Sequence, residues 1–166
     1  MTKRIRFSLT SKVFGVTALV ACVALFNSRV SANAPVGRYV IGTGATAGTV
    51  YDSVTALTWM RAPIENPIDW VGATTYCSDL TFGGSSDWRM PTVKEAATLV
   101  DESRYYPAVD SDAFPAMPSG YFWTGTLIPW DSTHAQTLHT GSGTIGVAYP
   151  LLDGTNKAVL RAICVH

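Results

Sequence analysis

The chain has 166 residues, with 12 basic and 12 acidic side chains and a formal net charge of zero. Five of the basic residues and none of the acidic ones lie in the first 32, so the remainder carries seven basic against twelve acidic residues, a net charge of −5. This charge argues against nucleic acid and other polyanions as partners, because the sequence shows no local cluster of Lys and Arg to bind them.

The first 32 residues have the pattern of an export signal. Basic residues up to Lys12 precede a fourteen-residue apolar run over residues 13–26, which is shorter than a membrane-spanning helix requires. Small residues predict cleavage after Ala32. Two alternatives remain open: Cys22 lies in a lipobox-like sequence and would then carry a lipid anchor, or the leader stays uncleaved as an anchor. Each alternative predicts an exported protein that is periplasmic, on the cell surface or extracellular.

Without the leader the chain has 134 residues, which suits one domain with one core. We expect a flexible segment over residues 33–47 and the domain over residues 48–166. This part of the chain contains two cysteines, Cys77 and Cys164. Two thiols in an oxidising compartment predict a disulfide. A reactive or metal-binding pair is the alternative, but no histidine lies nearby at metal-ligand spacing.

The first predicted elements are strands and a helix. Aromatic and β-branched residues predict a strand at 38–41, and "TVYD" (49–52) with "LTWMR" (57–61) predicts a hairpin. Asp69 is a good helix N-cap, and the residues after it place apolar side chains three and four positions apart. We therefore expect a helix that ends at the glycines of residues 82–86.

A second helix is predicted from the stretch "SDWRMPTVKE" at 86–95. Met90 precedes a proline and is therefore expected to be extended. Thr92 and Glu95 form a capping-box pattern, in which each side chain bonds the backbone N–H of the other residue. The helix is expected to continue to about Asp101.

The rest of the chain predicts loops and strands. Residues 102–120 contain three prolines and are expected to form a long loop. We predict a strand at 121–126, a turn-rich link at 128–136, a hairpin about residues 141–143 and a closing strand at 157–166. Strands followed by two helices and further strands predict an α+β fold, with two helices packed on antiparallel strands.

Several stretches together resemble the Lcl C-terminal domain family. They are "TVYDSVTALTWMR", a Trp and the pair Tyr-Cys in the first predicted helix, "SDWRMPTVKEAATLVD", "PAVDSDAFP", "YFWTGT" and a closing Arg-x-x-Cys-Val. The resemblance covers roughly residues 48 to 166. Members of this family are secreted bacterial domains, many of unknown function, named after the end domain of a collagen-like adhesin. This chain lacks the collagen-like repeats of that adhesin.

The resemblance implies a C-type lectin-like fold, which is also similar to formylglycine-generating enzymes. In C-type lectin-like domains a disulfide joins a helix to the final strand, an arrangement that Cys77 and Cys164 would reproduce. Formylglycine-generating oxidases need free cysteines, so the resemblance does not imply that activity here. The Glu-Pro-Asn and Trp-Asn-Asp motifs of calcium-dependent lectins are absent. The adhesin's preference for sulfated polysaccharide is not expected to extend to a domain with a net charge of −5.

The triplet Asp87-Trp88-Arg89 combines charge with an aromatic ring and is a candidate ligand site. The favoured interpretation is structural: the ring fills the core, and the arginine pairs with the aspartate or with backbone carbonyls. The predicted structural motif consists of Asp87, Trp88, Arg89, Pro91, Thr92 and Glu95.

Four acidic residues around the long loop, Asp101, Glu102, Asp110 and Asp112, are candidate metal ligands. Calcium takes six or more oxygen ligands, which carboxylates in a loop can supply. Their spacing does not resemble an EF-hand, and acidic residues in proline-rich loops commonly form turns or face solvent. The favoured interpretation is therefore a domain without a cofactor, and a calcium site is the alternative.

Four aromatic residues lie in or beside predicted loops and are candidate binding residues: Tyr105, Tyr106, Tyr121 and Trp130. Exposed rings stack on sugar faces, and loops on a rigid scaffold commonly carry recognition. The alternative is that these rings pack onto the core and hold the loops in place.

The sequence predicts no catalytic residues. His134 and His139 lie near serines, but the chain shows neither a nucleophile elbow nor the order of a catalytic triad. We therefore predict a non-catalytic binding domain whose partner is a glycan or an extracellular protein. The alternative is an envelope structural module without a small ligand, in contact with a membrane only if it is lipidated at Cys22.

Overall fold

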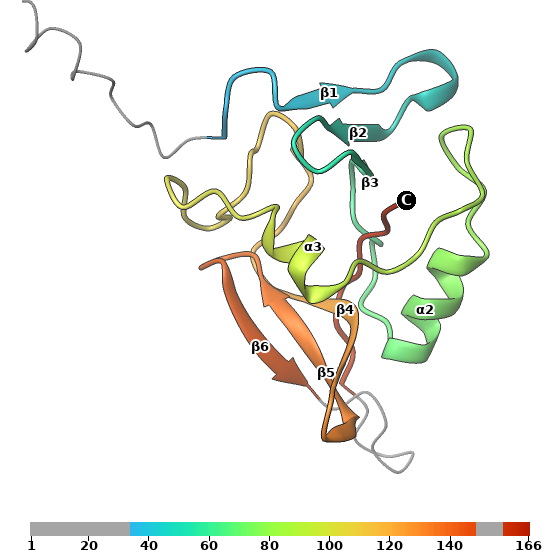
Figure 1. Ribbon diagram of the computed structural model, residues 1–166, viewed down its shortest axis with the longest axis vertical. Coiled ribbons are helices and arrows are strands. Elements are labelled where there is room, and N and C mark those ends of the chain that lie inside the picture. The colour runs from blue at the N-terminus through green and yellow to red at the C-terminus, as the bar shows by residue number, and fades with distance from the viewer. Residues whose placement is uncertain (1–33, 149–157) are drawn as a thin grey trace, which may run out of the picture. The chain divides into compact units, whose positions relative to one another are not determined.

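The computed structural model describes residues 34–148 and 158–166 (Figure 1). The predicted leader, its cleavage site at Ala32 and the lipidation candidate Cys22 lie outside these residues. The described part contains two antiparallel three-stranded sheets and two α-helices, which confirms the predicted α+β class. Within it, no helix has both the length and the apolar character needed to cross a bilayer.

The first sheet consists of β1 (Tyr39–Ile41), β2 (Thr49–Asp52) and β3 (Leu57–Met60), in that spatial order. The β2–β3 hairpin has the predicted strands, and each residue of β2 has a partner in β3. The segment 33–47, for which we expected flexibility, contains β1 and a short 3₁₀ helix, η1 (Gly44–Thr46). β1 is held to β2 over three residue pairs, so part of this segment belongs to the folded domain.

The second sheet consists of β4 (Tyr121–Ile128), β5 (Asp131–His139) and β6 (Thr144–Ala148). The hairpin about residues 141–143 joins β5 to β6, as predicted. The prediction of a turn-rich link at 128–136 is wrong, because β5 begins directly after a two-residue turn. The polar start of β5 has little strand propensity of its own. It is a strand because it pairs with β4 on one side and, further along, with β6 on the other, and such context overrides local propensity.

The first helix, α2 (Trp70–Ser78), begins where the sequence predicts. The side chain of Asp69 accepts a hydrogen bond of 2.7 Å from the backbone N–H of Gly72, which satisfies one of the free donors at the helix start. The helix ends earlier than the expected glycines at 82–86. These glycines form a separate tight turn, closed by the backbones of Phe82 and Ser85, which bond each other in both directions.

The second helix, α3 (Val93–Ala97), is also shorter than predicted. Its capping box is present: the Glu95 N–H donates to Thr92 Oγ1 over 3.2 Å, and the Thr92 N–H donates to a Glu95 carboxylate oxygen over 2.7 Å. The helix stops four residues before Asp101 because Val100 pairs with Val109 of the long loop. After α3 the backbone therefore leaves the helical path, because it pairs with the long loop and no longer with the preceding turn of the helix.

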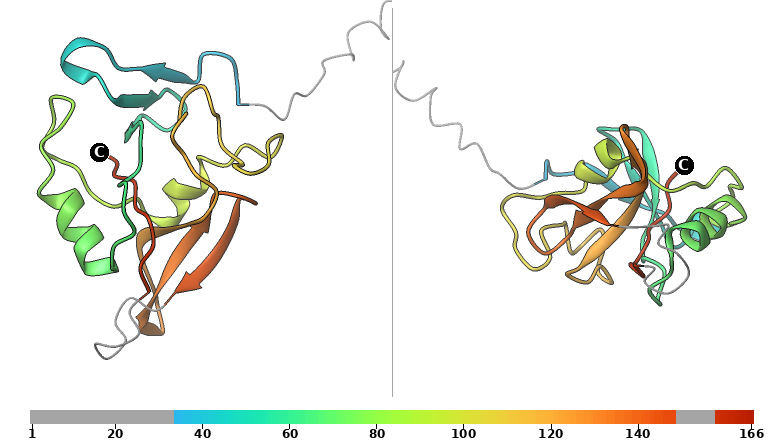
Figure 2. Two further views of the ribbon diagram at one scale, coloured as in Figure 1. Left: turned by 180° about the vertical axis from the view of Figure 1, so that it is seen from behind. Right: turned by 90° about the horizontal axis from the view of Figure 1, so that it is seen from below.

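The closing segment, residues 158–166, lies at the centre of the fold. We predicted a regular strand at 157–166, but the described part makes short pairings with several elements in place of one continuous ladder. The pairs joined by backbone hydrogen bonds include Thr58 with His166, Ile68 with Leu160, Arg89 with Val165 and Trp123 with Arg161. In the views of Figures 1 and 2 the segment runs between α2 and the second sheet. It thereby connects elements that make few direct contacts with each other.

The predicted disulfide joins Cys77 of α2 to Cys164 of the closing segment. Both residues are fully buried, and 87 positions separate them in the sequence. The bond therefore fixes the first helix against the central segment. The alternative of a reactive or metal-binding cysteine pair is wrong for this structure.

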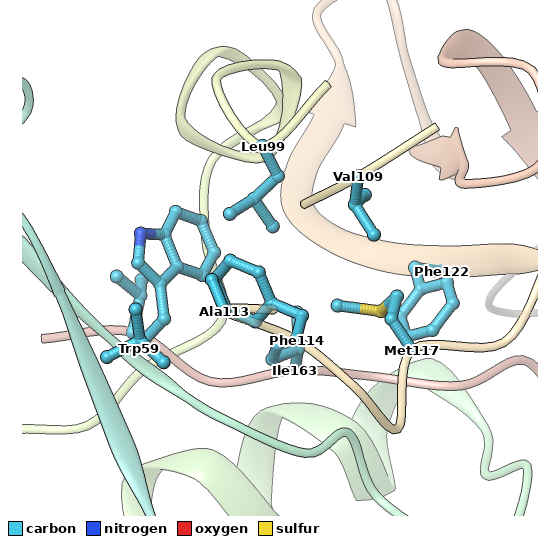
Figure 3. Packing of buried hydrophobic residues seen from close by; sticks show 10 residues of the cluster. Trp59, Leu99, Val109, Ala113, Phe114, Met117, Phe122 and Ile163 are labelled. Atoms are coloured by element: carbon cyan, nitrogen blue, oxygen red, sulfur yellow. The ribbon is translucent and has the colours of Figure 1, made fainter. Parts of the chain in front are cut away.

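The buried core has two clusters, one on each side of the closing segment. The cluster in Figure 3 contains Trp59 of β3, Phe122 of β4 and Phe114 of the long loop. The other surrounds the disulfide and contains Trp88 and Trp123. The long loop has no regular structure, but its apolar residues enter the first cluster, so it is anchored to the core at several points.

Candidate binding surfaces

Trp88, at the centre of the predicted structural motif, is a core residue. Its side chain is 2% exposed, and its indole N–H donates a hydrogen bond of 2.9 Å to the backbone carbonyl of Phe82. The ring lies edge-on to His166, with 4.5 Å between the ring centres. The ring therefore packs between the glycine-rich turn and the end of the chain, in agreement with the structural interpretation.

Arg89 has a partner that the sequence analysis did not assign to it. We expected Asp87 or backbone carbonyls, but the guanidinium binds Glu95 through two hydrogen bonds of 2.8 and 2.7 Å. A longer bond of 3.3 Å reaches the carbonyl of Met90. Glu95 is the better partner because the capping box already fixes its carboxylate at the start of α3. Asp87 is exposed and takes no part in this pair.

The Arg89–Glu95 pair gives a pH prediction. The hydrogen bonds from Arg89, assisted by those from Thr92, lower the pKa of Glu95 from its ordinary 4.5 to about 2. A carboxyl group whose pKa is lower in the folded state stabilises the fold at pH values above its unfolded pKa. This contribution is complete above about pH 5.5 and is lost as the pH falls towards 2. We therefore expect Glu95→Gln to be about 1 kcal/mol less stable than the native chain at neutral pH.

This difference should shrink towards zero as the pH approaches 2, and urea unfolding of both proteins across the pH range will measure it. Asp87→Asn is a suitable control, because Asp87 is an exposed acid outside the pair. A stability difference between Glu95→Gln and the native chain that is constant over the pH range would contradict the prediction.

The four candidate metal ligands do not form a common site. The carboxylate of Asp101 is buried, yet its pKa is lowered, because hydrogen bonds from Ser103 and the backbone of Ala34 and the charge of Arg104 together outweigh the effect of burial. Arg104 lies between the acids, 3.2 Å from Asp101 and 3.9 Å from Asp110. Asp110 accepts from the backbone N–H of Asp112 over 2.9 Å, as in a turn. Glu102 is exposed. Within residues 34–148 and 158–166, no three acidic, histidine or cysteine side chains gather as metal ligands.

The four candidate aromatic residues are exposed to solvent and do not pack onto the core. The exposed fractions are 71% for Tyr105, 58% for Tyr106, 52% for Tyr121 and 86% for Trp130. They fall into two groups. The three tyrosines gather with His139 on one surface, which we call the tyrosine surface. Trp130 lies beyond the other end of β4, about 25 to 30 Å from Tyr121 at the usual rise of a strand.

Ring contacts hold the tyrosine surface together. Tyr105 and Tyr106 meet edge to face with ring centres 4.4 Å apart, and Tyr106 lies 6.4 Å from the ring of His139. His139 in turn lies 4.5 Å from the ring of Tyr121. Tyr121 and His139 are directly opposite in the β4–β5 ladder, so the sheet sets their contact. We considered His139 only as a catalytic candidate from the sequence, and the strand pairing that places it here was not predictable.

The long loop brings Tyr106 to this surface through its backbone. The N–H of Tyr106 donates to the carbonyl of Gly141 over 3.0 Å, and Tyr106 has a φ of +50°, which side-chain-bearing residues rarely adopt. A Cβ on Gly141 would lie 2.7 Å from the ring of His139 and 3.0 Å from that of Tyr106. Gly141 is therefore needed for both rings to approach the hairpin turn. Backbone strain at an exposed aromatic residue is typical of a functional position.

Trp130 forms the wall of a separate hollow at the tip of the β4–β5 hairpin, which lies at the bottom of Figure 1. The hollow has a volume of about 220 Å³ and is lined by Ile128, Trp130, Asp131, His134 and Val147. Asp131 accepts hydrogen bonds from Thr133, and one of its oxygens lies 2.6 Å from Nδ1 of His134. The bonds from Thr133 lower the pKa of Asp131, so its carboxylate is ionised at neutral pH.

Comparison with known proteins supports the resemblance described from the sequence. The family model described as "Lcl C-terminal domain" matches residues 48–164. A search of curated proteins gives no match. The matched range contains strands β2 to β6, both α-helices and the two cysteines of the disulfide, and covers well over half of the chain. The chain belongs to the Lcl C-terminal domain family.

Proposed function

We propose that this chain is an exported, non-catalytic domain with a C-type lectin-like fold that binds an extracellular glycan or matrix polymer through the tyrosine surface. The tie between α2 and the closing segment supports the lectin-like fold, because it is the link that the family resemblance implies. The observation that carries the binding proposal is the presence of three exposed tyrosines, joined by ring contacts, on one surface.

The chemistry of the tyrosine surface suits a sugar. A tyrosine offers an apolar face for the C–H groups of a sugar ring and a hydroxyl group for its polar edge. Because Tyr105, Tyr106 and Tyr121 already contact one another or His139, fewer rotamers are lost on binding than for free side chains. Ser142 and Thr144 add hydroxyl groups beside His139. The domain's excess of acidic residues favours a neutral polymer over a sulfated one.

The pair His139–Ser142 supports a structural contact better than a catalytic one. Nδ1 of His139 lies 2.9 Å from the hydroxyl of Ser142, but the backbone N–H of Ser142 also donates to Nδ1 over 3.3 Å. The two residues are therefore joined as parts of one hairpin turn. In the described part of the chain, no carboxylate bonds His139 to orient it as a general base. We accordingly propose binding without catalysis.

A glycan array probed with the secreted form of the chain will test this proposal. We expect binding to neutral polysaccharides that Tyr121→Ala reduces by about tenfold, because the loss of one stacked ring costs roughly 1.4 kcal/mol. Tyr51→Ala is the matched control: Tyr51 is also exposed, at 42%, but lies on the first sheet. Absence of binding across neutral and acidic glycans would favour the alternative of an envelope structural module.

A further inference from the structure

We propose that the hollow at the tip of the β4–β5 hairpin is a second and separate binding site, which takes one terminal pyranose residue of an uncharged glycan. We call it the tip site; it consists of Ile128, Trp130, Asp131, His134 and Val147. It shares no residue with the tyrosine surface and lies about 25 to 30 Å from it. An experiment on the tip site therefore tests it independently of the proposed function.

Trp130 provides the stacking face of the tip site. It is 86% exposed and lies in the two-residue turn between β4 and β5, where the fold requires no large ring. The other tryptophans of the chain are packed differently. Trp59, Trp88 and Trp123 are buried, and the indole of the partly buried Trp70 bonds the carbonyl of Thr124 over 2.9 Å. Of the five tryptophans, all of which lie in the described part of the chain, Trp130 is the one with a largely exposed ring.

The hollow beside Trp130 has the size of a monosaccharide site. Ile128, which is buried, and Val147, which is exposed on the neighbouring strand β6, give it apolar walls. Its volume of about 220 Å³ is below the 300 to 1,000 Å³ typical of sites for larger organic ligands. One sugar ring against the indole would cover the apolar walls, while the rest of a glycan would extend into solvent.

Asp131 provides a hydrogen-bond acceptor at the edge of the same hollow. Its side chain is 38% exposed, and contacts with Thr133 and His134 fix its orientation. These contacts use three of the roughly four acceptor positions of a carboxylate, so one position on the oxygen facing His134 is left for a ligand hydroxyl. A carboxylate that is fixed before binding loses little entropy when it accepts that hydrogen bond.

The charge of the tip site selects among ligands that would stack on an exposed ring. An ionised Asp131 repels sulfated sugars, uronates and the phosphate groups of lipids. None of the lining residues is Lys or Arg, and His134, the remaining lining residue that can carry a positive charge, faces Asp131. Sugar hydroxyl groups are neutral donors and suit a carboxylate acceptor. An uncharged pyranose matches the ring, the hollow and the carboxylate together, whereas an anionic lipid surface matches the ring alone.

The test is an NMR titration of the isotope-labelled secreted chain with methyl β-glucopyranoside, methyl β-galactopyranoside and methyl N-acetyl-β-glucosaminide. The indole N–H signal of Trp130, assigned by its loss in Trp130→Phe, is the reporter, and that of Trp70 is the control. We expect a saturable shift of the Trp130 signal with at least one glycoside, at a dissociation constant of the order of 1 mM. Asp131→Asn, which keeps the contacts with Thr133 but not the charge, should weaken binding about tenfold.

Variants at Trp130 separate stacking on the indole from other causes of binding. With the methyl signals of Val147 as reporter, Trp130→Phe should bind with reduced affinity and Trp130→Ala should not bind. Tyr121→Ala should bind like the native chain, which separates this result from the failure or success of the tyrosine surface. No shift of the Trp130 signal at about 50 mM of each glycoside would overturn the proposal. Tighter binding of glucose 6-sulfate, or a shift only with anionic lipid vesicles, would overturn it as well.

Discussion

Replacing Cys77 and Cys164 together with alanine is expected to lower the free energy of unfolding by about 4 to 5 kcal/mol. The bond joins residues 87 positions apart, and the entropy lost by the unfolded chain on closing a loop of that length corresponds to this figure. For a domain of this size the loss should lower the melting temperature by the order of 15 °C. The effect should be large because the bond joins α2 to the segment at the centre of the fold.

Chemical unfolding of the native chain, the double variant and the native chain under reducing conditions will measure this effect. The reduced native chain should approach the stability of the double variant, and a reducing agent should not change the variant further. The packing of the two buried sulfur atoms adds to the loss in the variant. A double variant that is less than about 1 kcal/mol below the native chain would show that packing alone fixes the closing segment.

The parts of the fold that the sequence predicted correctly depend on neighbours in the chain. The N-cap at Asp69, the capping box of Thr92 and Glu95 and the β2–β3 hairpin each need only a few adjacent residues. The disulfide was predictable for a different reason: the part of the chain after the predicted leader contains two cysteines. In each case, few competing arrangements were available.

The parts that were not predicted depend on distant pairing. The start of β5 has a polar sequence typical of a turn, yet it continues a strand that pairs with β4 and, from Ala135 onward, with β6. The closing segment has strand propensity, but its role as a central connector is set by partners as distant as Thr58 and Arg89. Helix α3 ends early because Val100 has a partner in the long loop. No local pattern contains these partners.

The candidate sites show the same limit. For the aromatic residues near loops the sequence left both exposure and packing onto the core open, and the structure shows them exposed. Their division into a tyrosine surface and a separate hollow around Trp130 depends on the length and pairing of β4. His139 belongs to the tyrosine surface only because it is opposite Tyr121 in the sheet. For Arg89 the sequence analysis named Asp87 as the acidic partner, because Asp87 is closer in the sequence than Glu95.

Replacing Asp52 with alanine is expected to lower the free energy of unfolding by about 3 to 5 kcal/mol, since it leaves a mostly buried arginine without its partner. Asp52 is fully buried and accepts hydrogen bonds of 2.9 and 2.6 Å from Arg38 and one of 3.0 Å from the backbone of Val54. Burial opposes the charge on Asp52, but the hydrogen bonds from Arg38, Val54 and Thr55 and the charge of Arg38 together outweigh it and lower the pKa of the carboxyl. Arg38 also donates to the carbonyl of Thr98 over 2.7 Å, so the pair joins the first sheet to the end of α3.

A double variant separates the cost of an unpaired charge from the value of the pair itself. Arg38→Met with Asp52→Leu removes both charges and fills a similar volume. The double variant should therefore be more stable than Arg38→Met alone or Asp52→Leu alone, although the N–H of Val54 loses its acceptor. Asp87→Ala, at an exposed acid, should change stability by less than about 0.5 kcal/mol. If the stability losses of Arg38→Met and Asp52→Leu simply add in the double variant, the two residues contribute independently. The ion pair would then not be what joins the first sheet to the end of α3.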